Sequence, residues 1–160
     1  RKQAYSIIQN RDKHIKDRLL ELLDYGKEIQ KDLDIYDEGN DDIDFFEVFD
    51  NPEVINQEWV EKVKAGKENK ISNEIYNEQI AMYFLFKYFL LAVYDYDVLS
   101  KIKMAVIGVL IVTYFGEESW VIHLWSKETE HSQYNMERYK KLLKSAKCLS
   151  TKELEKRLSN

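Results

Sequence analysis

Four polar residues in the C-terminal half of the chain have the types and spacing of a general acid–base site. Glu128, His131, Ser132 and Asn135 fall within an arc of about 100° when successive residues are placed 100° apart around a helix. The same stripe continues at both ends into apolar residues, which are Leu124, Tyr139, Leu142 and Leu143. The pattern therefore predicts that the four polar groups point inward, where each needs a partner or a ligand.

Two interpretations of this group remain open. In the first, it is a buried hydrogen-bond network that runs from Glu128 to His131 and from His131 to Asn135. In the second, it is a pocket in which His131 is the acid, the base or a ligand, and Glu128 or Asn135 orients the ring. Only the second interpretation gives the residues a direct role in chemistry.

Glu128 and His131 also have the Glu-x-x-His spacing of helical di-iron proteins. Such a site needs a second Glu-x-x-His pair and two further carboxylates. The other two histidines, His14 and His123, have no acidic residue three positions before them. A helical metalloprotein that uses Glu128 and His131 is thus the weakest of the functions considered, and we expect no metal in this chain.

Aromatic residues are concentrated in the middle of the chain, between Tyr76 and Phe115. We expect most of them to fill the core, because buried rings make the largest apolar contribution available to a helical bundle. The alternative is that tyrosines such as Tyr83 line a cleft and form a cage for a cationic lysine head group.

The elements that position these residues are expected to be helices. Apolar residues recur at three- and four-residue steps along most of the chain and predict an all-α bundle of five to six helices. The expected helices span about 2–29, 51–66, 72–94, 95–116 and 119–147, with a short last helix that starts at Ser150. The helices over 72–94 and 95–116 are expected to be central and buried, since residues 80–93 are apolar on every side except at Lys87. Residues 104–112 also fit a buried strand locally, but the pattern extends back to an aspartate cap and favours a helix.

A long acidic connection is predicted over residues 32–51. Ten acidic residues and no Lys or Arg lie from Asp32 to Glu53, so the net charge of −5 leaves the remaining residues with +5. We predict a solvated loop here, whose phenylalanines dock back on the core. These are Phe45, Phe46 and Phe49.

Several classes of protein are excluded or disfavoured by composition. The five glycines lie too far apart for a dinucleotide-binding or P-loop motif. One cysteine, Cys148, allows neither an internal disulfide nor a thiolate cluster, and is compatible with a reducing cytoplasm. Basic residues are scattered, so no nucleic-acid partner is expected. Neither apolar run reaches the length of a membrane span, so we expect no membrane either.

The segment 124–135 resembles a signature of the flagellin lysine-N-methylase family. It reads Leu-Trp-Ser-Lys-Glu-Thr-Glu-His-Ser-Gln-Tyr-Asn, and the family pattern is Y-S-K-E-x-E-H-S-x-x-N, with Trp125 in place of the tyrosine. Two further segments agree in order along the chain. Residues 8–20 resemble the family's L-Q-D-R and R-L-L helix, and residues 83–89 resemble its aromatic helix.

The resemblance implies that the whole protein methylates lysine side chains of flagellin in the bacterial cytoplasm, with S-adenosylmethionine as the donor. It also implies an iron–sulfur cluster in an N-terminal half that carries cysteine clusters, which Cys148 cannot replace. Residues 1–160 are then expected to form a single helical domain, the C-terminal half of the enzyme, with no cofactor of its own and no activity alone. Its expected partners are flagellin and that N-terminal half.

The resemblance also assigns roles to residues. Methyl transfer to lysine requires a neutral amine, so Glu128 and His131 are the candidate catalytic groups. Ser132, Asn135 and Tyr83 are the candidate substrate-binding or orienting groups. The alternative function is a non-catalytic helical module that binds a protein through its aromatic cleft and acidic loop.

Overall fold

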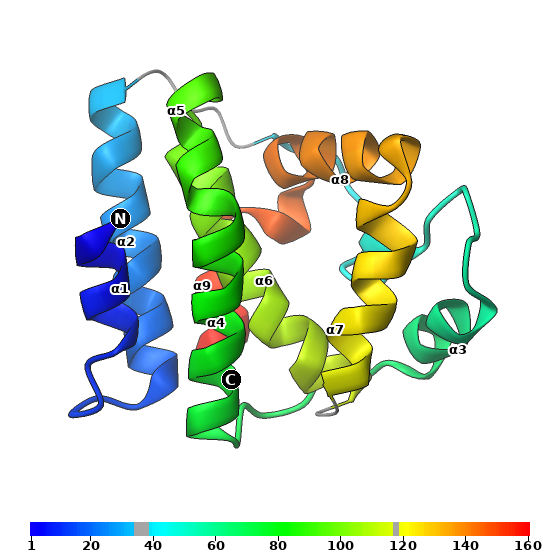
Figure 1. Ribbon diagram of the computed structural model, residues 1–160, viewed down its shortest axis with the longest axis horizontal. Helices are drawn as coiled ribbons and strands as arrows, with labels where there is room; N and C mark the ends of the chain where they lie inside the picture. The colour runs from blue at the N-terminus through cyan, green and yellow to red at the C-terminus, as the bar shows by residue number, and fades with distance from the viewer. Residues whose placement is uncertain (34–38, 117–118) are drawn as a thin grey trace. The chain divides into compact units, whose positions relative to one another are not determined.

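The computed structural model describes residues 1–33, 39–116 and 119–160 (Figure 1). Every named element in these ranges is a helix, and an isolated bridge joins Asp41 to Ala146. The predicted all-α fold class is confirmed. The chain forms two compact units. Unit 1 contains Arg1–Asp37, Ile71–Val109 and Thr151–Asn160, and unit 2 contains Glu38–Lys70 and Leu110–Ser150.

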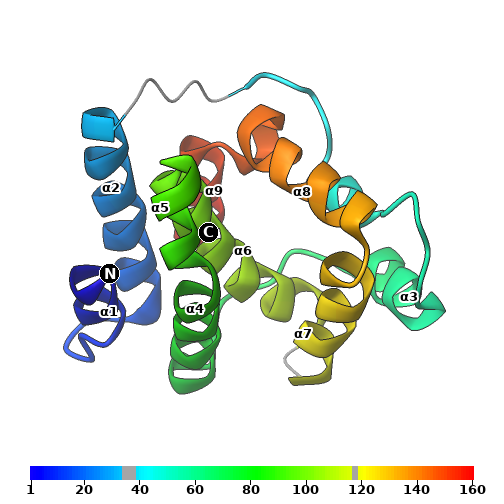
Figure 2. The same cartoon turned by 45° about the horizontal axis from the view of Figure 1, so that its top comes forward.

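Unit 1 consists of long helices and of shorter helices that pack on them. Its elements are α1 (Lys2–Ile8), α2 (Ile15–Leu33), α4 (Glu74–Tyr88), η2 (Phe89–Leu91), α5 (Ala92–Asp95), the first part of α6 (Val98–Phe115) and α9 (Thr151–Ser159). Helix α1 packs against both α2 and α4, and Figures 1 and 2 show the three side by side. Helix α9 packs against α2.

Two glycines allow the close approach of α6 in unit 1. A Cβ atom on Gly108 of α6 would lie 2.4 Å from the ring of Phe84 on α4. A Cβ atom on Gly26 of α2 would lie 2.8 Å from the Cδ1 atom of Ile102 on α6. The missing side chains therefore bring α6 into direct contact with both neighbouring helices.

Unit 2 is organised around a core of aromatic rings. Its elements are η1 (Glu47–Phe49), α3 (Gln57–Ala65), the rest of α6, α7 (Ser119–Trp125), the π-helix η3 (Ser126–Glu130), α8 (Gln133–Ser145) and η4 (Lys147–Leu149). Rings in edge-to-face or tilted contact fill this core. They include Phe45, Phe49, Trp59, Tyr114, Phe115, Trp125 and Tyr139.

The phenylalanines of the acidic connection dock as predicted. Phe45 and Phe49 are buried, and half-buried Phe46 contacts the rings of Tyr114 and Phe115. The connection is shorter than predicted, because α2 extends to Leu33. Its residues 34–38 lie outside the described ranges.

The helices expected from about residues 72 and 95 begin at Glu74 and Val98, each just after a residue whose side chain caps it. The side chain of Asn73 accepts the N–H of Tyr76 at 3.0 Å, and that of Asp97 accepts the N–H of Ser100 at 3.0 Å. Residues 104–112 are helical, which settles the strand alternative. Among the described helices, α6 has the length and apolar composition to cross a membrane, but its whole 18-residue window is buried, as in a core helix.

Three predicted helices differ from the structure. The helix expected over 2–29 is broken between α1 and α2 at residues 9–14. The helix expected from residue 51 begins at Gln57, where Asn56 caps it by accepting the N–H of Glu58 at 2.9 Å. Just before it, side chains of η3 and α8 accept the backbone N–H groups of Glu53, Ile55 and Asn56, which are then not available for helical hydrogen bonds. The helix expected over 119–147 is divided into α7, η3 and α8.

The prediction that residues 80–93 are buried all round is wrong. Phe86 is 67% exposed, Val93 is 69% exposed, and Tyr94 just beyond them is 84% exposed. The helices of unit 1 cover only one side of α4, on which Ala81, Phe84 and Leu85 are fully buried.

Candidate functional site

Three of the four polar residues singled out in the sequence come together in unit 2. Glu128 and Asn135 are completely buried, and Ser132 is 4% exposed. We call these three residues the polar cluster. They surround the backbone of residues 53–56, the non-helical segment that leads into α3.

The carboxylate of Glu128 binds two backbone N–H groups. It accepts the N–H of Ile55 at 3.1 and 3.0 Å and the N–H of Asn56 at 2.6 Å. Asn56 is the N-cap of α3, so the negative charge lies where the unpaired N–H groups and the dipole of that helix favour an anion. The contacts give Glu128 a structural role, as the anchor of the start of α3.

Asn135 and Ser132 bind Glu53, the first residue of the segment 53–56. The Nδ2 atom of Asn135 donates to the carbonyl oxygens of Glu53 and Glu128, both at 2.8 Å, and its Oδ1 atom accepts the N–H of Glu53 at 3.3 Å. The Ser132 hydroxyl donates to the Glu53 carboxylate and accepts the N–H of Asn135 at 3.1 Å. Both amide hydrogens and the carbonyl oxygen of Asn135 are therefore occupied within the protein.

His131 does not join the polar cluster. Its side chain is exposed, so the prediction that it points inward is wrong. The cause is the π-helical turn of Ser126–Glu130, which is wider than an α-turn and places consecutive residues Glu128 and Thr129 inside. Ser132 then starts a new helix as N-cap of α8. His131 lies in the turn between the two helices, where the predicted 100° spacing no longer holds.

Tyr83 lies on α4, in unit 1. It is 40% exposed, and its hydroxyl accepts a hydrogen bond from the Lys87 Nζ atom at 3.1 Å. The same Nζ atom lies 5.4 Å from the centre of the Tyr83 ring, a cation–π distance. Tyr83 thus presents an aromatic ring at the surface that already binds a cation of the chain itself.

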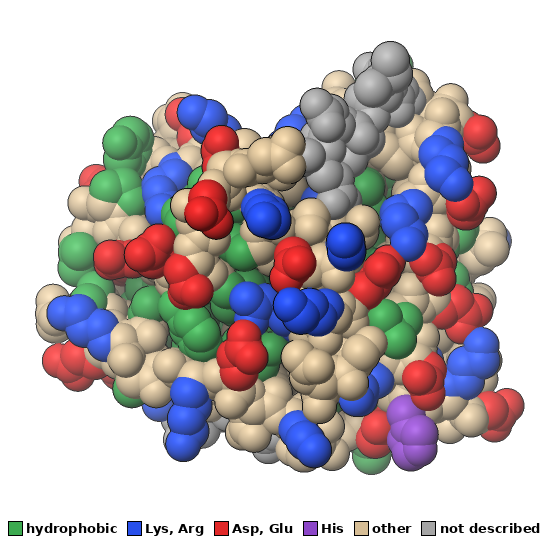
Figure 3. All heavy atoms as spheres, turned by 180° about the vertical axis from the view of Figure 1, so that it is seen from behind, with side chains coloured by type: hydrophobic (Ala, Val, Ile, Leu, Met, Phe, Trp, Pro, Cys, Tyr) green, Lys and Arg blue, Asp and Glu red, His purple; other side chains and the backbone are tan. Residues whose placement is uncertain are grey.

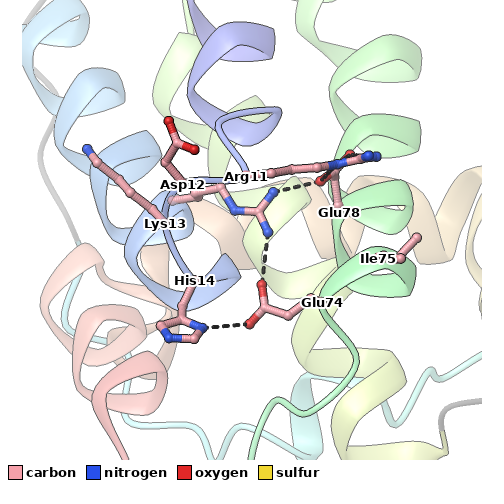
Figure 4. A pocket seen from close by; sticks show the side chains of 8 residues that line it. Arg11, Asp12, Lys13, His14, Glu74, Ile75 and Glu78 are labelled. Carbon is pink, nitrogen blue, oxygen red and sulfur yellow. Dashed lines mark hydrogen bonds and ion pairs between the residues drawn. The ribbon is translucent and has the colours of Figure 1, made fainter.

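A second group of charged residues, in unit 1, is not evident from the sequence. Arg11, in the turn that joins α1 to α2, binds Glu78 of α4, and Arg18 of α2 binds both Glu74 and Glu78. Arg11, Glu74 and Glu78 are labelled in Figure 4. Arg18 is only 2% exposed, and its two terminal nitrogens lie 2.9 Å from Glu74 and 2.7 Å from Glu78. We call these four residues the Arg–Glu cluster.

Hydrogen bonds of this cluster fix the ends of two helices. Arg18 donates to the carbonyl oxygen of Ile8, the last residue of α1, at 2.6 Å. Glu74 accepts the N–H of Ile15, the first residue of α2, at 2.7 Å, which places a negative charge at the start of that helix. The cluster therefore anchors both ends of the turn at residues 9–14 to α4.

The two glutamates of the cluster are stabilised in their charged form. Hydrogen bonds from Arg11 lower the pKa of Glu78; burial opposes this shift and Arg18 adds to it. For Glu74, burial acts to raise the pKa, but the Ile15 N–H and the Arg18 guanidinium together hold it below its ordinary value.

A cavity of about 310 Å³ adjoins the Arg–Glu cluster. Its lining contains Arg11, Asp12, Lys13, His14, Arg18, Glu74, Ile75 and Glu78. Basic and acidic groups are paired across it; Figure 4 shows His14 pointing at Glu74, with Nδ1 and Oε1 3.3 Å apart. The guanidinium of Arg18 is bound by the protein's own carboxylates and by a carbonyl. The Arg–Glu cluster therefore has a structural role.

The Arg–Glu cluster could not be predicted from the sequence alone. Glu74 and Glu78 are four residues apart on one helix, which is a visible signal for a shared face. Their partners Arg11 and Arg18 lie more than fifty residues away, and only the packing of α1 and α2 on α4 brings them together.

The described residues offer no ready metal centre. Within residues 1–33, 39–116 and 119–160, no group of three or more His, Cys, Asp or Glu side chains is placed to hold an ion. Glu128 is buried while His131 is exposed, so the Glu-x-x-His pair is not assembled. Cys148 alone does not fit an iron–sulfur cluster, which requires several thiolates.

The charges on the face seen in Figure 3 are mixed. Lys and Arg side chains lie among Asp and Glu side chains there. Comparison with known proteins adds no family assignment, since no protein-family model, curated protein or solved structure matches this chain.

Proposed function

We propose that this chain is a protein-binding helical domain of a protein-lysine N-methylase, and that its partner is flagellin. The observation that carries the proposal is an exposed stripe of large apolar residues in unit 1. We call it the apolar face; it consists of Ile75, Tyr83, Phe86, Leu90, Val93 and Tyr94. The name of the enzyme and of its partner comes from the resemblance of residues 124–135 to the methylase signature.

The apolar face follows one side of consecutive helical segments. On α4, Ile75, Tyr83 and Phe86 fall within an arc of roughly 80° at about 100° per residue. Leu90, Val93 and Tyr94 follow on the 3-10 turn η2 and on α5. Each of them is at least 40% exposed. Large exposed apolar patches are uncommon on soluble proteins and usually mark a surface that another molecule covers.

We assign binding rather than chemistry to this chain. Both oxygens of Glu128 accept backbone N–H groups, and Asn135 and Ser132 are occupied with Glu53. The segment that resembles the methylase signature thus has a structural role in unit 2. This role supports the assignment of binding rather than chemistry. The methyl donor, S-adenosylmethionine, and the iron–sulfur cluster are then assigned to the rest of the enzyme.

Direct binding tests the proposal. The purified chain is immobilised, and flagellin from the same organism is passed over it in biolayer interferometry. Phe86→Asp should weaken binding by at least about tenfold, because it places a charge at the centre of the apolar face. Tyr134→Asp is the matched control, since Tyr134 is 62% exposed but lies on α8 in unit 2.

Two outcomes would contradict the proposal. Wild-type chain that does not bind flagellin removes flagellin as the partner, and equal binding by Phe86→Asp and Tyr134→Asp removes the apolar face as the site. The same face also fits the alternative in which the domain belongs to no enzyme and only binds a protein. Methyl transfer to flagellin by the full-length protein distinguishes the methylase from this alternative.

A further inference from the structure

We draw no further inference here: the strongest candidate, the cavity between α4 and the turn at residues 9–14, belongs to the Arg–Glu cluster already described, whose basic and acidic side chains bind one another.

Discussion

Replacing Glu128 by glutamine tests whether the polar cluster holds unit 2 together. In the wild-type protein, the two carboxylate oxygens accept the N–H groups of Ile55 and Asn56 in a completely buried site. Glutamine has the same shape but only one acceptor oxygen. Its amide NH₂ group would face a backbone N–H, so one buried donor would lose its partner.

The expected loss follows from these contacts. A hydrogen bond to a charged group contributes about 1.5–3 kcal/mol, and a buried donor left without a partner costs about 1–3 kcal/mol. Because Glu128→Gln keeps one of the two acceptors, we expect unit 2 to lose about 3 kcal/mol of unfolding free energy. With a urea slope of about 2 kcal/mol per M, the midpoint of unfolding should fall by about 1.5 M.

Tryptophan fluorescence reports on unit 2 alone. All three tryptophans, Trp59, Trp120 and Trp125, lie in that unit, and Trp59 and Trp125 are buried. Their emission should therefore follow the loss of the aromatic core during urea titration, while circular dichroism at 222 nm follows the helices of both units. Only the fluorescence midpoint is expected to shift by the full amount.

The control variant is Glu137→Gln on α8. Glu137 is exposed and accepts a hydrogen bond from the Gln133 side chain at 2.8 Å, so its replacement should change stability by no more than about 0.5 kcal/mol. A Glu128→Gln midpoint equal to that of Glu137→Gln would refute the reasoning. The buried carboxylate would then contribute nothing to holding residues 53–56.

Three further changes test other parts of the structure. Glu78→Gln removes a carboxylate whose folded-state pKa lies below the ordinary 4.5; its stabilisation is present above that pH and is lost as the pH falls through the lower folded-state value. Thermal melts by circular dichroism should show a deficit of about 3 kcal/mol at about pH 7 that shrinks as the pH falls below 4.5. Gly39→Ala places a Cβ atom 2.4 Å from the Cα atom of Ser145 and should cost unit 2 about 2 kcal/mol or more by fluorescence-detected urea titration. Asn73→Ala removes the cap of α4 and should cost about 1 kcal/mol in urea titration followed by circular dichroism; no loss would contradict the capping role.

Local signals in the sequence predict much of the helical structure. The caps at Asn73 and Asp97 depend on side chains that bind N–H groups three residues away, so a short segment contains all the information. The inward side of α8 also follows from spacing, since Asn135, Tyr139 and Leu143 are buried at four-residue steps.

Contacts between distant segments of the chain determine the features that the sequence does not predict. The π-turn at Ser126–Glu130 faces residues 53–56, which lie more than seventy positions earlier in the chain. A periodicity of 3.6 residues cannot anticipate this change of helix type, and the orientation of His131 was therefore predicted wrongly. The exposure of Phe86 has a similar origin, because an apolar sequence does not reveal whether its partner lies in the same chain.

The position of His131 makes it the decisive residue for any catalytic role of this segment. Substituting Glu128, Ser132 or Asn135 removes contacts that hold unit 2, so a loss of methylation in such variants does not separate chemistry from folding. His131→Ala changes an exposed side chain and should alter stability by less than about 0.5 kcal/mol. Under the proposed function, full-length protein with this change methylates flagellin at the wild-type rate, as does the surface control Lys127→Ala. A fall of kcat by about a hundredfold or more in His131→Ala alone would instead give the histidine a role in proton transfer, and the chain a part in the chemistry.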